Sequence, residues 1–153
     1  MHKAVHLYKQ SNDHPEQLPA LTLAFIGDAV YELYVRTMML GQSHNAHVLN
    51  RRCVHLVNNR AQSALYERLE PALNETELGV LHRGRNAKGI VPKNARTQDY
   101  RRATAVEALV GYWYLMDDDD RLAWAFDILW QITEAPQGET LFTSEGDNNE
   151  QSR

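Results

Sequence analysis

The stretch Leu23-Ala24-Phe25-Ile26-Gly27-Asp28-Ala29-Val30-Tyr31-Glu32 lies within the longest apolar-rich segment of the chain, 18–40. Apolar side chains recur there at helical spacing, and Pro19 and Gly41 suit the first position of a helix and the position after its end. Charged residues interrupt the segment, so we expect a buried helix rather than a membrane span. Helical spacing continues along the chain without a clear alternating strand pattern. The sequence therefore predicts an all-α fold.

Five further helices are expected from capping residues and stop signals. Their approximate ranges are 43–57 with Ser43 as the cap, 58–71 with Asn58 as the cap, a short helix from Asn74, 97–116 and 121–133. Asn74 and Glu77 have the spacing of a capping box. Segment 84–96 contains Gly89 and Pro92 and is expected to be a loop. One domain would span 1–133, and the acidic tail 134–153 is expected to be disordered.

The composition is that of a globular domain, with 43% hydrophobic and 24% charged residues among 153. The single cysteine, Cys53, excludes an internal disulfide framework and favours a reducing compartment. Residues 1–10 do not resemble a signal peptide, so we expect a cytoplasmic protein without a membrane partner. The net charge of -4 argues at first against nucleic acid, but five acids lie in 134–153, and local charge decides docking.

Asp28 and Glu107 are acids that stand alone within apolar, helix-forming sequence. Gly27 precedes Asp28, and Gly111 follows Glu107 by one turn; a helical glycine costs about 1 kcal/mol relative to alanine, and one use is close approach of a backbone or ligand. The apolar neighbours predict that Asp28 is buried, and a buried charge is costly unless it is paired or bound to a cation. Two carboxylates can hold one hydrated Mg²⁺. The alternative is that each acid pairs with a buried arginine, tyrosine or backbone amide.

Segment 83–102 carries seven basic residues against one acid, Asp99. Cations, amides and glycines suit contacts with phosphates and sugars. Residues 83–96 lack the aromatic side chains that stack on single-stranded bases, which favours a nucleic-acid duplex. The candidate RNA-binding residues are Arg83, Arg85, Asn86, Lys88, Lys93, Asn94 and Arg101. A solvated basic loop without a partner is the alternative.

Three motifs, in this order, resemble those of the ribonuclease III family. Phe25-Ile26-Gly27-Asp28-Ala29-Val30 resembles its signature helix, and Glu107-Ala108-Leu109-Val110-Gly111 resembles its second acidic motif. Between them, Arg83-Gly84-Arg85-Asn86-Ala87-Lys88, Pro92-Lys93-Asn94 and Tyr100-Arg101 resemble the short branch of the family, Mini-ribonuclease III. The resemblance covers about 18–132.

The resemblance implies an all-α endonuclease domain that works as a homodimer, with double-stranded RNA lying in a groove shared by the subunits. Asp28 and Glu107 would be the catalytic, metal-binding acids. The metal would be Mg²⁺, with Mn²⁺ as a substitute, and it would activate water to leave 5′-phosphate and 3′-hydroxyl ends. The short branch is associated with maturation of the large-subunit (23S) ribosomal RNA precursor. An assisting ribosomal protein is a further expected partner.

The sequence also departs from the family pattern. Longer members have glutamates seven and four residues before the signature aspartate, where this chain has Leu21 and Ala24. Their aspartate three residues before the second-motif glutamate is Thr104 here. We therefore expect a more hydrated metal site than one held entirely by carboxylates. The chain is also too short for the usual C-terminal RNA-binding domain, so the catalytic domain and its basic loop are expected to bind RNA.

Two other functions are considered: a catalytically inactive RNA- or ribosome-binding module, and a helical metalloenzyme that acts on small phosphoesters. The presence of Asp28 and Glu107 argues against the first. The basic loop and the lack of a histidine–aspartate metal motif argue against the second. The leading expectation is a metal-dependent endoribonuclease that cuts double-stranded RNA.

Overall fold

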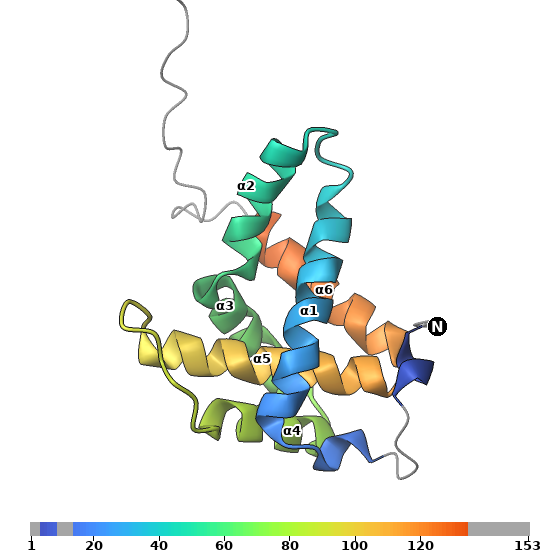
Figure 1. Cartoon of the computed structure of the whole chain (residues 1–153), viewed down its shortest axis with the longest axis vertical. Helices are drawn as coiled ribbons and strands as arrows, with labels where there is room; N and C mark the ends of the chain where they lie inside the picture. Colours follow the sequence, from blue (N-terminus) through green and yellow to red (C-terminus); the bar gives the residue numbers. More distant parts are fainter. Residues whose placement is uncertain (1–3, 9–13, 135–153) are drawn as a thin grey trace, which may run out of the picture.

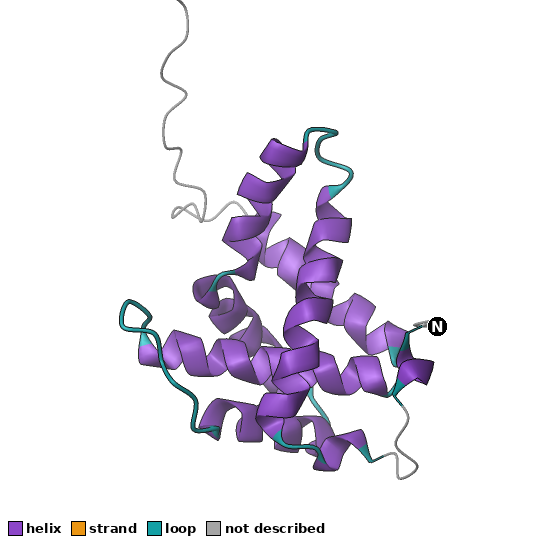
Figure 2. Cartoon of the chain, viewed as in Figure 1, coloured by secondary structure: helices purple, strands orange, loops and turns teal. Residues whose placement is uncertain are grey.

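The computed structural model describes residues 4–8 and 14–134, and within these ranges every regular element is helical (Figures 1 and 2). The predicted all-α fold is confirmed. The six α-helices are α1 (Ala20–Met39), α2 (Ala46–Val57), α3 (Asn59–Leu69), α4 (Glu75–Asn86), α5 (Thr97–Leu115) and α6 (Asp119–Glu134). Short 3-10 turns form η1 (Val5–Leu7), η2 (Pro15–Gln17) and η3 (Glu70–Ala72). Among the described helices, we find no candidate for a membrane-spanning segment. The expected tail, 134–153, lies outside the described residues except for Glu134.

Side-chain caps set the starts of the three middle helices. Asn58 caps α3 by accepting from the amide of Ala61, and Asn74 with Glu77 forms the predicted capping box of α4. The predicted cap of α2 was wrong. Asn45, not Ser43, accepts from the first-turn amides of α2, while the Ser43 hydroxyl accepts from the amide of Asn45 at 3.0 Å. Ser43 therefore orders the residue that caps the helix.

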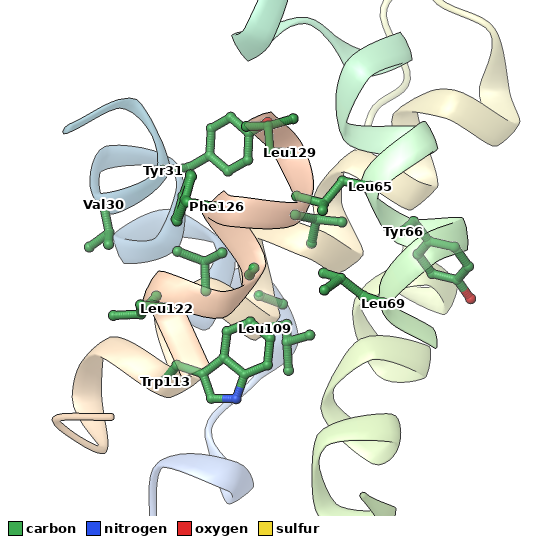
Figure 3. Close-up of a cluster of buried hydrophobic side chains, with 14 of the residues drawn as sticks. Val30, Tyr31, Leu65, Tyr66, Leu69, Leu109, Trp113, Leu122, Phe126 and Leu129 are labelled. Atoms are coloured by element: carbon green, nitrogen blue, oxygen red, sulfur yellow. The ribbon is translucent and has the colours of Figure 1, made fainter. Parts of the chain in front are cut away.

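Helix α5 is the centre of the domain. Helix α1 crosses its middle, and α3, α4 and α6 also pack against it (Figure 1). Its inner side chains, including Leu109 and Trp113, are fully buried. They join a core to which α1, α3 and α6 contribute Tyr31, Leu65, Leu69, Leu122, Phe126 and Leu129 (Figure 3). The two helices that carry the candidate acids, α1 and α5, are thus fixed by the core itself.

Glycine allows α1 and α5 to touch backbone to backbone. A Cβ on Gly27 would lie 1.7 Å from the carbonyl oxygen of Glu107, and one on Gly111 would lie 2.1 Å from the carbonyl oxygen of Leu23. No side chain fits in either place. The sequence predicted that these glycines allow close approach of a backbone or a ligand. The close neighbour of each glycine is the backbone of the opposite helix, so the prediction is confirmed for a backbone.

The loop within the basic segment begins later than expected. The sequence predicted a loop over 84–96, but α4 continues to Asn86, and the loop covers 87–96. Gly84 is buried against α5, where an added Cβ would lie 2.7 Å from the Cα of Ala105. This glycine therefore packs two helices together rather than ending one.

A partly buried ion pair joins the other end of α4 to α6. Glu77 is buried and accepts from Arg121 Nε at 2.8 Å and from Trp113 Nε1 at 3.0 Å. The Arg121 guanidinium also lies 4.3 Å from the ring centroid of Trp124. The capping-box glutamate thus has a second, tertiary role that its sequence spacing did not indicate.

Candidate active site

The crossing of α1 over α5 brings Asp28 and Glu107 together. Gly27 lies against the backbone of Glu107, so the next residue on α1, Asp28, is beside the Glu107 side chain. The charge of Asp28 reaches it, because it contributes to the raised pKa of Glu107. Two acids that are far apart in sequence therefore form one electrostatic site.

The two acids differ in exposure. Glu107 is partly buried, whereas Asp28 is exposed, so the expectation that apolar neighbours bury Asp28 was wrong. The reason is that α1 carries apolar residues on its solvent side as well. Phe25, three residues before Asp28, is 81% exposed, and Leu33 is 62% exposed. The apolar residues around Asp28 therefore did not show which face of α1 is buried in the core and which is exposed to solvent.

Glu107 is held in an unfavourable electrostatic environment. Burial, and then the neighbouring charge of Asp28, raise its pKa to about 7, and a hydrogen bond from Gln62 opposes this rise. The Gln62 Nε2 lies 3.2 Å from Glu107 Oε1. Burial, with a smaller contribution from Glu107, also raises the pKa of Tyr31, whose hydroxyl donates to the carbonyl of Leu56 at 2.7 Å. Glu107 is therefore a partly buried acid that has a hydrogen-bond donor but no cationic partner among the described residues.

The donor set fits a hydrated, oxygen-preferring cation. Within the described ranges, no group of three or more histidine, cysteine or acidic side chains is placed to hold a metal. Two adjacent carboxylates repel each other, and a divalent cation between them would remove that repulsion. Mg²⁺ keeps several waters and is held in proteins by as few as one or two carboxylates. Glu32, one turn from Asp28, forms an ion pair with Arg36 at 2.5 Å and is not part of this set.

The predicted RNA-binding residues fall into two groups. Arg83 and Arg85 are held by the domain: Arg83 donates to the carbonyl of Glu16, and Arg85 Nη1 donates to the Tyr66 hydroxyl at 2.9 Å. Arg85 also donates to the Asn86 side chain at 3.3 Å. The second group contains four exposed residues, which make no ion pair with other described residues: Lys88, Lys93, Asn94 and Arg101.

A cavity of about 330 Å³ lies between the basic loop and the two helices that carry the acids. Thr104 lines it one turn before Glu107, and Leu21 lines it two turns before Asp28, so the cavity lies along the same helix faces as the acids. Its other walls come from the end of α4, the loop and the start of α5, and include Asn86, Lys88, Tyr100 and Arg101. Lys88 and Arg101 thus place positive charge at a cavity on the helix faces that carry the acidic pair.

Sequence reasoning missed Gln62, although it is 1% exposed and contacts Glu107 directly. Its signal was a glutamine on the apolar face of the predicted third helix, in line with Leu65 and Leu69. A polar residue at a core position needs a partner, and that partner is 45 residues away in sequence.

Comparison with known proteins agrees with this geometry. The family model of the ribonuclease III domain matches residues 21–118. The chain belongs to the ribonuclease III family. Membership also confirms the predicted enzyme class, a double-strand-specific endoribonuclease. The matched range contains both acids and the whole basic segment.

Relatives of the short branch cover most of this chain. It is 46% identical over 113 residues to "Mini-ribonuclease 3" of Desulfitobacterium hafniense (strain Y51), which covers 73% of this chain and 72% of that protein. It is 40% identical over 128 residues to "Mini-ribonuclease 3" of Brevibacillus brevis (strain 47 / JCM 6285 / NBRC 100599), covering 82% and 93%. A crystal structure of a protein from Fusobacterium nucleatum superposes with a TM-score of 0.70 at 30% identity, covering 74% of this chain and 93% of that one. The predicted resemblance to the short branch of the ribonuclease III family is confirmed.

Proposed function

We propose that the protein cuts double-stranded RNA at the pair formed by Asp28 and Glu107, which hold a divalent cation. Mg²⁺ is the expected cation, and Mn²⁺ the expected substitute. The observation that carries the proposal is the meeting of two carboxylates from crossing helices beside a cavity rimmed by cations. A divalent cation in such a site supplies an activated water and stabilises charge on the reacting phosphate.

The chain's own residues have separate roles in this proposal. Asp28 and Glu107 bind the cation and so fix where the RNA backbone is cut. Lys88 and Arg101 on the rim of the cavity, with Lys93 and Asn94 on the loop, contact neighbouring phosphates and sugars. Arg83, Arg85 and Asn86 shape the end of α4 from which that loop leaves, and their RNA contacts remain a prediction.

The test is cleavage of a long RNA duplex with added Mg²⁺ or with a chelator, against a single-stranded RNA of the same length. We expect cutting of the duplex alone, its loss in the chelator, and its return when Mg²⁺ or Mn²⁺ is added in excess. An inactive RNA-binding module would bind the duplex without cutting it. A phosphoesterase for small substrates would hydrolyse a simple phosphoester and leave the duplex intact.

For the natural substrate, we propose a duplex region of the large-subunit ribosomal RNA precursor in the cytoplasm, presented with help from a ribosomal protein. The similarity to the short branch supports this substrate. Sequencing the ends of ribosomal RNA from cells that lack the protein tests it. Extended ends on the large-subunit RNA are expected, and mature ends would contradict the proposal.

We also propose a homodimer with two-fold symmetry, paired through the exposed apolar side of α1. Leu21, Phe25 and Leu33 recur there at four-residue or eight-residue spacing and are 46%, 81% and 62% exposed. Apolar patches of this kind mark interaction surfaces, and an isologous interface suits a duplex whose strands are related by local two-folds. Asp28 lies on the same helix, so pairing would place the acids of two subunits along one groove.

Replacing Phe25 and Leu33 by glutamate should convert the protein to monomers and lower cleavage strongly, since like charges would face each other across the two-fold axis. Val54→Glu is the matched control, because Val54 is 60% exposed on α2 and lies outside this stripe. Sedimentation at micromolar concentration measures the outcome. A wild-type protein that is monomeric and fully active would contradict the dimer.

Replacing Lys88 and Lys93 by alanine should weaken RNA binding and reduce the salt dependence of log K by about one to two units, because each phosphate contact releases counterions. Both side chains lack ion pairs with other described residues, so the fold should be unaffected. Residual cutting should recover at high protein concentration and low salt. Arg68→Ala removes one exposed cation of α3 as a control. An unchanged affinity and slope in the double variant would place the duplex elsewhere, for instance on Arg51, Arg52 and Arg60.

A further inference from the structure

The side chain of Gln62 is a buried amide that contacts the site directly. It lies on α3, is 1% exposed, and is one of three buried polar or charged side chains among the described residues. Its Nε2 donates to Glu107 Oε1 at 3.2 Å. Its own oxygen, Oε1, is buried and accepts no hydrogen bond from the described part of the chain. The amide nitrogen is therefore hydrogen-bonded to Glu107, whereas the amide oxygen is unsatisfied.

Stability alone does not explain an amide at this position. A buried acceptor without a partner costs roughly 1–3 kcal/mol. An apolar side chain of similar shape would avoid that cost, although it would also remove the hydrogen bond to Glu107 Oε1. The amide also cannot reverse, because exchanging its oxygen and nitrogen would place two acceptors face to face while Glu107 is ionised. An unsatisfied buried polar group in a folded protein calls for an explanation, and a role in a functional site is one such explanation.

The position of Gln62 is fixed by an arginine clamp between α3 and α5. Arg102 Nη1 donates to Glu67 Oε1 at 2.6 Å and to Ser63 Oγ at 3.4 Å, and its guanidinium lies 5.2 Å from the ring centroid of Tyr66. This clamp holds α3 on α5 next to Gln62. The amide is therefore presented to Glu107 by two helices that are locked together.

The hydrogen bond also distinguishes the two oxygens of Glu107. Gln62 occupies Oε1, and no other described residue is hydrogen-bonded to Oε2. We propose that Gln62 is a positioning residue of the metal site: its amide fixes the Glu107 carboxylate so that the free oxygen and Asp28 bind one cation together. This inference rests on the proposed metal site. Partners of this kind, which orient a metal ligand, commonly change metal affinity by 10- to 100-fold when they are removed.

The test replaces Gln62 by leucine and, with a more nearly isosteric side chain, by methionine. Mn²⁺ binding is measured without RNA, by titration calorimetry or by the electron paramagnetic resonance signal of free Mn²⁺. We expect a nearly unchanged melting temperature in the metal-free protein, because removing the unsatisfied oxygen offsets the lost hydrogen bond to Glu107. The Mn²⁺ affinity should be 10- to 100-fold weaker. RNA affinity measured in chelator should not change. Cleavage should need correspondingly more metal.

Gln98→Leu is the matched control, because it makes the same change from an amide to an apolar side chain at an exposed position of α5, nine residues before Glu107. It should bind Mn²⁺ as the wild type does. Wild-type Mn²⁺ affinity in both Gln62 variants, or a loss of stability without a loss of affinity, would overturn the inference. Asp28→Asn separates failure of this inference from failure of the proposed metal site. If this variant binds Mn²⁺ as tightly as the wild type, the proposed metal site itself is wrong.

Discussion

Glu107→Gln should abolish cleavage of double-stranded RNA and at the same time make the metal-free protein more stable at neutral and alkaline pH. Loss of a ligand to a cation that supplies several kcal/mol of transition-state stabilisation lowers turnover by about a thousandfold or more. The gain in stability has a different origin. It comes from removing a charge that burial and Asp28 disfavour.

The sign of the stability change follows from the direction of the pKa shift. In the folded protein the pKa of Glu107 is raised from 4.5 to about 7, so the folded state binds this proton more tightly than the unfolded chain does. Ionisation therefore destabilises the fold as pH rises from about 4.5 to about 7, by up to about 3 kcal/mol. Glutamine is neutral at every pH and lacks this loss.

Thermal unfolding in chelator checks this prediction at several pH values. At pH 8 the variant should melt at a higher temperature than the wild type, and the difference should shrink as pH falls toward 5. Asp28→Asn is the companion variant. It should also be inactive. Its gain in stability should be smaller, because burial of Glu107, the larger cause of the raised pKa of that residue, remains in this variant. Near-wild-type cleavage in either variant would show that its carboxylate is not required.

Gly27→Ala should be strongly destabilising and should inactivate the enzyme, although it adds one methyl group. The new Cβ would lie 1.7 Å from the carbonyl oxygen of Glu107 and 2.8 Å from the amide nitrogen of Gly111. Both neighbours belong to a helix backbone and cannot rotate away, so α1 and α5 must separate. Overpacking in a core costs typically 1–3 kcal/mol, and a backbone clash of this depth should exceed that range.

Gly79→Ala is the control for the general effect of alanine in a helix. Gly79 lies in α4, and an added Cβ there meets nothing within 4 Å, so this variant should be stabilised by up to about 1 kcal/mol. Denaturant unfolding measures both variants. A Gly27→Ala protein with wild-type stability would mean that α1 and α5 do not meet as closely as described. Its cleavage, measured on whatever fraction folds, reports how far the acids have moved apart.

Local signals in the sequence account for most of the fold that could be predicted. Asn58 and the Asn74–Glu77 pair act within one turn of helix, so their spacing alone indicates where α3 and α4 begin. Ser43 was assigned wrongly as a cap because two polar residues that can cap a helix, Ser43 and Asn45, lie two positions apart. Competition between neighbours is settled by backbone geometry, which the sequence does not display.

The sequence predicted only those site residues that a single residue in a single motif is sufficient to identify. Asp28 and Glu107 stood out as isolated acids, but their different exposures depend on which face of α1 packs on α5. Arg85 contacts Tyr66, and Glu107 contacts Gln62, in each case across to another helix. Such tertiary contacts arise from packing between distant segments and leave no local pattern.

The most direct test of the central claim, that Asp28 and Glu107 hold one catalytic cation between them, is Mn²⁺ titration of the wild type, Asp28→Asn and Glu107→Gln under identical conditions. The account predicts that the wild type binds Mn²⁺ and that either substitution greatly weakens or abolishes this binding, while circular dichroism shows the same helix content in all three proteins. Unchanged Mn²⁺ binding in both folded variants would contradict the account, because the cation would then be held by other residues.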